Sequence, residues 1–173
     1  MTITDIDREY MKMALKEARK ALSRGDYPIG AVLLIDGKYV GIMGNSLHTG
    51  KDWISHAEAD LLRKYSKIIK KNVKKNKSEI VLYTTLEPCL MCLGTCILNR
   101  ISRIVYSCPD PHGGATRINP KELTEWYVRK WPQIEGGLYK EESYELMIEF
   151  MDMKNDDVWN KIKILFVKMH EKW

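Results

Sequence analysis

Two cysteines three positions apart, Cys89 and Cys92, follow Pro88 in the segment TTLEPCLMC. On the first turn of a helix, residues with this spacing face the same way, and the unpaired N–H groups there favour thiolates over thiols. Two thiolates are typical ligands of a tetrahedral zinc site. The segment SHAEAD supplies His56 as a third ligand. The sequence therefore predicts one zinc ion per chain, held by His56, Cys89 and Cys92.

A carboxylate follows the histidine by two positions. His56 and Glu58 point in different directions from a first helical turn, so one can bind the metal while the other reaches water. Three protein ligands leave a fourth position for that water, whose pKa zinc lowers from about 16 to near 7. Glu58 can take the water proton and pass it to a leaving amine. Glu58 is thus the predicted catalytic residue.

Other interpretations of these residues remain open. Ser55 and Glu58 have the spacing of a capping box, which would explain the glutamate without catalysis. The histidine could be an ordinary surface residue, and the two cysteines could belong to the core. Cys96 or Cys108 could instead complete a four-ligand structural site. The last arrangement would give a zinc-stabilised module that binds nucleic acid without catalysis.

Length and composition limit the class of protein. With 173 residues, 45% apolar and 29% charged, the chain can bury one core without disulfides. No segment reaches the roughly 18–20 apolar residues of a membrane helix, and the start lacks the features of a secretory signal. A cytoplasmic protein with no membrane partner is expected. Because thiols stay reduced in that compartment, the cysteines are expected to be ligands or buried residues.

The net charge is +5, from 28 basic and 23 acidic side chains. The segment KIIKKNVKKNK, residues 67–77, holds six of the lysines. Such a run forms either a solubilising face or a patch that attracts phosphate groups. The charge alone does not choose between them.

The expected elements place the candidate ligands at one edge of a sheet. Apolar spacing and turn residues predict four strands and three helices up to residue 107: a helix from about residue 5 to Gly25, a hairpin of 31–35 and 38–43, a helix of 55–67, a strand of 78–85, a helix of 89–99 and a strand of 101–107. Alternating strands and helices indicate an α/β fold with right-handed crossovers. Helix starts above the same sheet edge would bring His56 to the cysteines.

The last third of the chain is less regular. CPDPHGG reads as a turn-rich loop, residues 121–131 as a helix candidate, PQIEGG as a short strand and residues 141–153 as a helix. The final segment places apolar residues at helical spacing, from Val158 to Trp173. We expect this amphipathic helix to pack on the same domain rather than to bind a partner.

The paired motifs carry a resemblance to a known family. HAE at 56–58 together with PCLMC at 88–92 is the signature of zinc deaminases that act on nucleobases. From about residue 8 to residue 152 the sequence resembles the bacterial tRNA adenosine deaminases and related base and nucleoside deaminases. The likeness rests on PIGAVLL, GNS, TLEPCLMC, NRISRIVY, a loop from Asp110 that ends in GGA, and IEGGLYKEESYELMIEFM.

The resemblance implies a cytidine-deaminase-like fold of three α/β/α layers, with a mixed central sheet of about five strands. Residues 1–155 would form the deaminase domain, with the helix of 156–173 packed on it. The implied reaction is hydrolytic conversion of an exocyclic amine to a carbonyl, with release of ammonia, and the first candidate is adenosine to inosine in tRNA. A free nucleobase, nucleoside or nucleotide of cytosine, guanine or cytidine type is the alternative. The family also implies a homodimer.

The resemblance also implies substrate contacts. Asn45 would hold the sugar or the base edge, and Asp110 would face the nucleotide. Leu86 and Glu87 precede the cysteines, where backbone carbonyls would accept hydrogen bonds from the leaving amine. The pocket wall would come from Ile29 and the backbone around Gly30 and Ala31.

Two segments depart from the family pattern. The tRNA enzymes usually end in a basic, arginine-rich tail, whereas this chain continues MDMKNDDVW and adds a helix. It also inserts EWYVRKWP, with Trp126, Tyr127 and Trp131. These aromatic side chains either stack on bases or pack a helix onto the domain. The departures bear on the RNA substrate and leave the chemistry unchanged.

Overall fold

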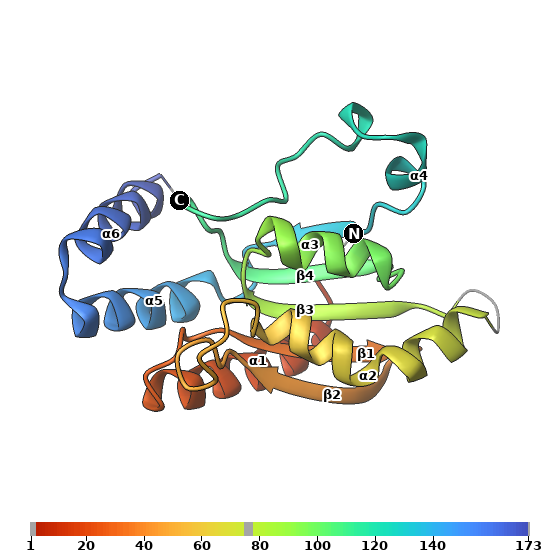
Figure 1. Ribbon diagram of the computed structural model, residues 1–173, viewed down its shortest axis with the longest axis horizontal. Coiled ribbons are helices and arrows are strands. Elements are labelled where there is room, and N and C mark those ends of the chain that lie inside the picture. Colours follow the sequence, from red (N-terminus) through yellow and green to blue (C-terminus); the bar gives the residue numbers. More distant parts are fainter. Residues whose placement is uncertain (1–2, 75–77, 173) are drawn as a thin grey trace.

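The computed structural model describes residues 3–74 and 78–172 and contains a five-stranded mixed sheet (Figure 1). The strand order is β2-β1-β3-β4-β5. β1 pairs antiparallel with β2 and β3, whereas β4 runs parallel to β3 and β5. The strands are β1 Gly30–Ile35, β2 Lys38–Gly44, β3 Ile80–Leu86, β4 Arg103–Cys108 and β5 Gln133–Gly136. The predicted mixed sheet of about five strands is confirmed.

Helices cover both faces of this sheet. α1 and α5 contact each other and the sheet on one face, and α2 and α3 lie together on the other (Figure 1). The α-helices are α1 Asp5–Ser23, α2 Ala57–Lys74, α3 Leu90–Leu98, α4 Glu125–Val128, α5 Lys140–Lys154 and α6 Asp157–His170. The fold therefore has the three α/β/α layers expected from the sequence. Among the described residues, no helix is long and apolar enough to cross a membrane.

The core forms where the two central strands meet the helices. Every residue of β1 and β3 is buried, which matches their almost continuous apolar sequences. Gly30 allows the closest approach, because a Cβ atom there would lie 2.1 Å from the carbonyl oxygen of Ala14 in α1. A side chain at this position would push the helix off the sheet. The glycine thus fixes how closely α1 packs.

Three local predictions need correction or completion. The capping box is wrong: α2 begins at Ala57, and the Ser55 hydroxyl donates to the Asp52 carboxylate at 3.2 Å. α2 also extends past residue 67 to Lys74, while Lys75 and Lys77 of the basic run lie outside the described residues. The helix candidate of 121–131 contains α4 and a preceding 3-10 turn, Pro120–Glu122.

The inserted aromatic residues pack against the core. Trp126, Tyr127 and Trp131 are partly buried side chains in contact with the core cluster. The Arg100 guanidinium lies 4.6 Å from the centroid of the Trp126 ring, a typical cation–π distance. The packing interpretation of this insertion is therefore confirmed.

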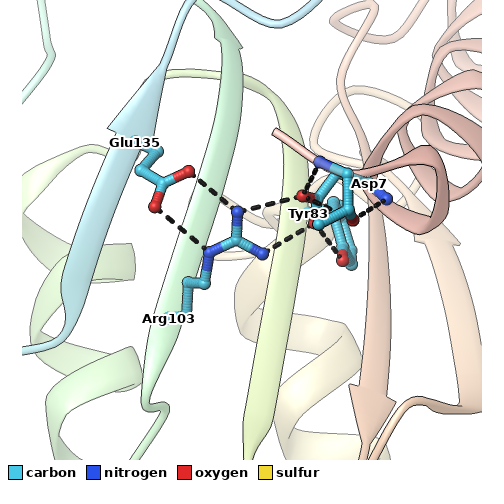
Figure 2. Close-up of polar contacts among 5 residues, drawn as sticks. Asp7, Tyr83, Arg103 and Glu135 are labelled. Carbon is cyan, nitrogen blue, oxygen red and sulfur yellow. Dashed lines mark hydrogen bonds and ion pairs between the residues drawn. The ribbon is translucent and has the colours of Figure 1, made fainter. Parts of the chain in front are cut away.

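A buried ion network joins three strands to α1 (Figure 2). The Arg103 guanidinium donates to both carboxylate oxygens of Asp7, at 2.7 and 3.1 Å, and to Glu135 at 2.8 Å. The Tyr83 hydroxyl donates to Asp7 at 2.7 Å. Burial raises the pKa of Asp7, but hydrogen bonds from Arg103, Thr4 and Tyr83 outweigh it and leave that pKa well below its usual value.

α6 packs on α5, next to the carboxyl ends of β3 and β4 (Figure 1). Phe166 is buried in the core cluster. Two ion pairs link the helices, Lys163 with Asp152 and His170 with Glu141. α6 is therefore attached at its middle and at its carboxyl end.

Candidate active site

The predicted ligands come together where two helices begin. His56 directly precedes α2, Cys89 is the N-cap residue of α3, and Cys92 lies in the first turn of α3. The Nδ1 atom of His56 lies 3.6 Å from the Sγ atom of Cys89 and 3.5 Å from that of Cys92. One ligand atom from each residue lies within 4.8 Å of the others. The meeting expected from the topology is present.

The distances between these atoms fit a tetrahedral zinc ion. Zinc–sulfur bonds of about 2.3 Å and zinc–nitrogen bonds of about 2.0–2.1 Å, at tetrahedral angles, separate nitrogen from sulfur by about 3.5–3.6 Å. The two observed nitrogen–sulfur distances have these values. Among the described residues, neither Cys96 nor Cys108 belongs to the ligand group, and both are buried. The donor set therefore matches a three-ligand site rather than a closed four-ligand one.

The electrostatics of the cluster favour a thiolate at Cys89. A hydrogen bond from the Cys92 thiol and another from His56 lower the pKa of Cys89 to about 4. The hydrogen bond with Cys89 in turn raises the pKa of His56. A thiolate thus forms readily at the start of α3, next to the helix N–H groups.

Glu58 lies in the first turn of α2 and is 3% exposed. Burial is the main influence that raises its pKa above the usual value for a glutamate. Its side chain lines the same pocket as His56 and Cys89. A buried carboxyl group that faces a metal site and a pocket is suited to carry protons.

A cavity of about 610 Å³ opens next to the ligands. Five of the predicted substrate residues line it, namely Ile29, Asn45, Leu86, Glu87 and Asp110. Ala31 does not. Successive side chains of a strand point to opposite faces, so Ala31 faces away from the α1 side that Gly30 adjoins, and it is fully buried in β1.

The loop that carries Asn45 is held by a buried carboxylate that the sequence analysis missed. Asp26 is 0% exposed and accepts hydrogen bonds from the backbone N–H groups of His48 and Thr49, both at 2.9 Å. The Thr49 hydroxyl donates to the same carboxylate at 2.8 Å. Arg24 lies 3.5 Å from Asp26 and also donates to the backbone oxygen of Asn45. An acid in the turn between α1 and β1 was the available signal.

Glu87 holds the loop on the other side of the pocket. Its carboxylate accepts hydrogen bonds from the backbone N–H groups of Asp110 and Thr116, each at 3.0 Å. A Cβ atom at Gly114 would lie 2.4 Å from the Glu87 carboxyl carbon, so the loop depends on a glycine there. Glu87 therefore acts on the pocket through this loop, which positions Asp110.

Asp110 keeps one carboxylate oxygen for its own loop. That oxygen accepts hydrogen bonds from the backbone N–H groups of His112 and Gly113, at 2.8 and 3.0 Å. Burial raises the pKa of Asp110. Its side chain lines the cavity, as does that of His112.

Further lining residues were not assigned from the sequence. They come from the loop after β2, from the turn before β1 and from α5 and α6: Tyr27, Leu47, His48, Trp53, Met147, Asp156, Val158, Trp159, Ile162 and Phe166. The amphipathic pattern of the last helix indicated a packed face, but not a pocket wall.

Comparisons with known proteins agree with this geometry. The model of the cytidine and deoxycytidylate deaminase zinc-binding region matches residues 4–108. The tRNA-specific adenosine deaminase of Agrobacterium fabrum (strain C58) is 34% identical over 148 residues, which cover 86% of this chain and 95% of the relative. The corresponding protein of Bacillus subtilis (strain 168) is also 34% identical and covers 83% and 88% of the two chains.

Solved structures give the same result. A structure from a study of A-to-I editing by tRNA:A34 deaminases is 34% identical, with a TM-score of 0.67 over 80% of this chain and 98% of that one. A guanine deaminase from Bacillus subtilis is 28% identical, with a TM-score of 0.52 over 62% and 66% of the two chains. Guanine deaminase from Nitrosomonas europaea, at 16% identity and a TM-score of 0.65 over 87% and 86%, shares the fold.

A three-layer fold with His-x-Glu and Cys-x-x-Cys at two adjoining helix starts defines the class of zinc-dependent deaminases. Within that class, the chain belongs to the cytidine and deoxycytidylate deaminase family.

Proposed function

We propose that this protein is a hydrolase that converts an exocyclic amine of a nucleobase into a carbonyl and releases ammonia. The observation that carries the proposal is the convergence of His56, Cys89 and Cys92 beside buried Glu58 in one pocket. One zinc ion per chain, held by these three ligands, would supply a Lewis acid that makes hydroxide available from water at neutral pH.

The protein's own residues move the protons. Glu58 takes one proton from water and gives it to the ring nitrogen as the water oxygen bonds to the ring carbon. It then takes the remaining hydroxyl proton and delivers it to the amine, so that the carbonyl forms as the carbon–nitrogen bond breaks. The sum is one water consumed and one ammonia formed, with Glu58 returned to its starting state. Asn45 and Asp110 orient the nucleotide from the two loops that Asp26 and Glu87 hold.

The first candidate substrate is adenosine in tRNA, which would become inosine. Support comes from relatives named tRNA-specific adenosine deaminases at 34% identity over most of both chains. A free nucleobase or nucleoside is the second candidate. It is favoured by α6, whose residues line one side of the pocket in place of a basic tail.

We also propose that the protein is cytoplasmic and forms a homodimer. In each subunit, residues 1–155 form the deaminase domain and the helix of 156–173 packs on it. Leu90 and Leu98, two turns apart on α3, are 66% and 65% exposed and form an apolar surface suited to a second copy. Light scattering should give twice the chain mass, and Leu98→Glu should give the monomer mass. A monomeric wild type would contradict this assembly.

The central experiment follows ammonia release and product mass with free bases, nucleosides and an anticodon stem-loop RNA. Glu58→Gln should keep about one zinc per chain and lose ammonia release, because Gln cannot accept the proton. Glu142→Gln, an exposed change on α5, is the matched control and should keep activity. Ammonia release by Glu58→Gln at the wild-type rate would refute the role of Glu58, and turnover of small molecules alone would exclude the RNA substrate.

A further inference from the structure

α6 adds a wall to the pocket outside the segment that matches the family model, which ends at residue 108. Four of its side chains and its N-cap residue line the cavity that also contains His56 and Glu58: Asp156, Val158, Trp159, Ile162 and Phe166. In Figure 1 the helix lies beyond the carboxyl ends of β3 and β4, where α3 also begins. The wall and the metal ligands therefore face one space.

This wall is fixed in place. The Lys163–Asp152 ion pair and the 2.7 Å contact between His170 and Glu141 join α6 to α5. The ring of His170 also stacks on Tyr144, with centroids 4.1 Å apart. Rigid surroundings let a pocket select ligands without a large ordering cost. α6 is thus able to set the shape of the site.

The wall presents aromatic surface. The Trp159 ring makes T-shaped contacts with two other rings, with centroids 5.4 Å from Tyr27 and 5.1 Å from Phe150. Tyr27 in turn stacks on His48, with centroids 5.2 Å apart and planes 8° from parallel. Aromatic side chains are the typical partners of nucleobases, because every base has a flat π face. A planar ring is the ligand that this wall suits.

The charges of the pocket disfavour an anion. Of the described residues that line it, four are acidic and none is Lys or Arg. Three of the acids, Glu58, Glu87 and Asp110, lie on the metal side, and Asp156 begins α6. The Asp156 carboxylate caps the helix by accepting from the N–H groups of Val158 and Trp159. A phosphate next to this wall would face the Asp156 carboxylate, and no Lys or Arg of the lining would offset it. Lys154, whose Nζ atom lies 5.0 Å from the centroid of the Phe150 ring, is outside the lining.

Resting on the deaminase function above, we propose that α6 is a specificity wall. Its Val158 and Trp159 side chains pack against an uncharged nucleobase or nucleoside, and Asp156 keeps the substrate's 5′-phosphate outside the pocket. The proposal holds for a free nucleoside and for a base turned out of an RNA strand, because the phosphates of the strand stay at the mouth.

Binding measured without turnover tests the wall. In a Glu58→Gln background, titration calorimetry with adenosine, guanosine and cytidine identifies the nucleoside that binds most tightly. Trp159→Ala should weaken that binding about tenfold, within the range for loss of one base–aromatic contact. Trp159→Phe should restore most of the affinity, and Ile164→Ala, on an exposed part of α6, should leave it unchanged. A change of less than twofold in a folded Trp159→Ala protein would overturn the proposal.

The charge of the wall has a separate readout. The 5′-monophosphate of the best nucleoside should bind at least tenfold more weakly than the nucleoside itself. Val158→Arg places a cation next to Asp156 and should reduce this ratio severalfold; because Val158 is 64% exposed, the change spares the core. Ile164→Arg is the matched control and should keep the ratio. Equal binding of nucleoside and monophosphate, or no binding of any panel member, would overturn the proposal that α6 is a specificity wall.

The two proposals fail separately. Loss of the wall effect leaves ammonia release by the wild type intact as the test of deamination. Absence of ammonia release with every substrate would refute deamination, while the binding ratios of the Glu58→Gln protein would still report on α6.

Discussion

Two clusters of ionisable side chains lie at opposite ends of the parallel strands, and they differ in whether their charges are paired within the protein. Arg103, the first residue of β4, has both of its carboxylate partners within the protein. Beyond the last residue of β3, the Nδ1 atom of His56 lies 3.6 and 3.5 Å from the Sγ atoms of Cys89 and Cys92. The first cluster is complete as folded, whereas the second is suited to an added cation.

The difference separates stability from function. Burying charges costs free energy, and the cost is met only when every group has a partner, as Asp7, Arg103 and Glu135 do. A metal site accepts incomplete pairing in the protein because metal binding supplies the missing interactions. Changes at the two clusters should therefore have different readouts, and the predictions below run from the largest expected effect to the smallest.

Loss of one metal ligand should have the largest effect. Cys92→Ala leaves two ligands, so bound zinc should fall from about one per chain to near zero and ammonia release should become undetectable. Metal analysis and an ammonia assay measure both. Cys96→Ala, one turn along α3 and outside the ligand group, is the matched control and should retain zinc. If Cys92→Ala retained zinc, the contrast between a complete ion network and a cluster that needs a cation would be wrong.

Loss of the central cation of the network should reduce stability instead. Arg103→Leu removes the cation that pairs with buried Asp7 and half-buried Glu135, which should lower the free energy of unfolding by about 3–5 kcal/mol. Urea unfolding measures this loss, and the folded variant should still bind one zinc. Arg63→Leu breaks an exposed pair with Asp60 at 3.1 Å and should cost about 1 kcal/mol or less. Equal losses in the two variants would contradict the assignment.

Acidification should weaken the ion network around Asp7, which is intact at neutral pH. Because the pKa of Asp7 is lower in the folded protein than in the unfolded chain, its stabilisation is present above the unfolded value of about 4. That stabilisation is lost as the pH falls through the range between the unfolded and the folded pKa. Asp7→Asn should therefore be less stable at neutral pH but lose less stability on acidification. Parallel curves of stability against pH for the two proteins would refute this linkage.

A smaller effect is expected at the loop that carries Asn45. Asp26→Asn removes the charge that two backbone N–H groups and the Thr49 hydroxyl share, which should raise KM by a few-fold to about tenfold. The kcat value of the folded enzyme should change less, because the metal site is untouched. Asp36→Asn, in the β1–β2 turn, is the control. A fall in kcat with KM unchanged would assign Asp26 a different role.

Local patterns were sufficient for most of the fold and for the meeting of the three candidate ligands. Alternating strands and helices and the paired motifs place His56 and the cysteines at one sheet edge, as found. These features depend on neighbours in sequence and on topology rules that hold across proteins. Family resemblance then pointed to Asn45 and Asp110, which line the pocket.

Features that depend on distant partners could not be predicted. Ser55 and Glu58 have capping-box spacing, yet the loop before α2 gives the serine Asp52 as its partner. The apolar face of the last helix indicates burial without indicating which surface it covers. Asp7 and Arg103 are 96 residues apart, so neither segment predicts the other.

The same separation bears on how the chain matures during translation. At about 5–20 residues per second, a ribosome needs roughly 5–20 s to deliver the arginine after the aspartate has been made. Until then, burial of the first helix would leave the Asp7 carboxylate without its arginine partner. The final docking of this helix must therefore await synthesis of the second half of the protein.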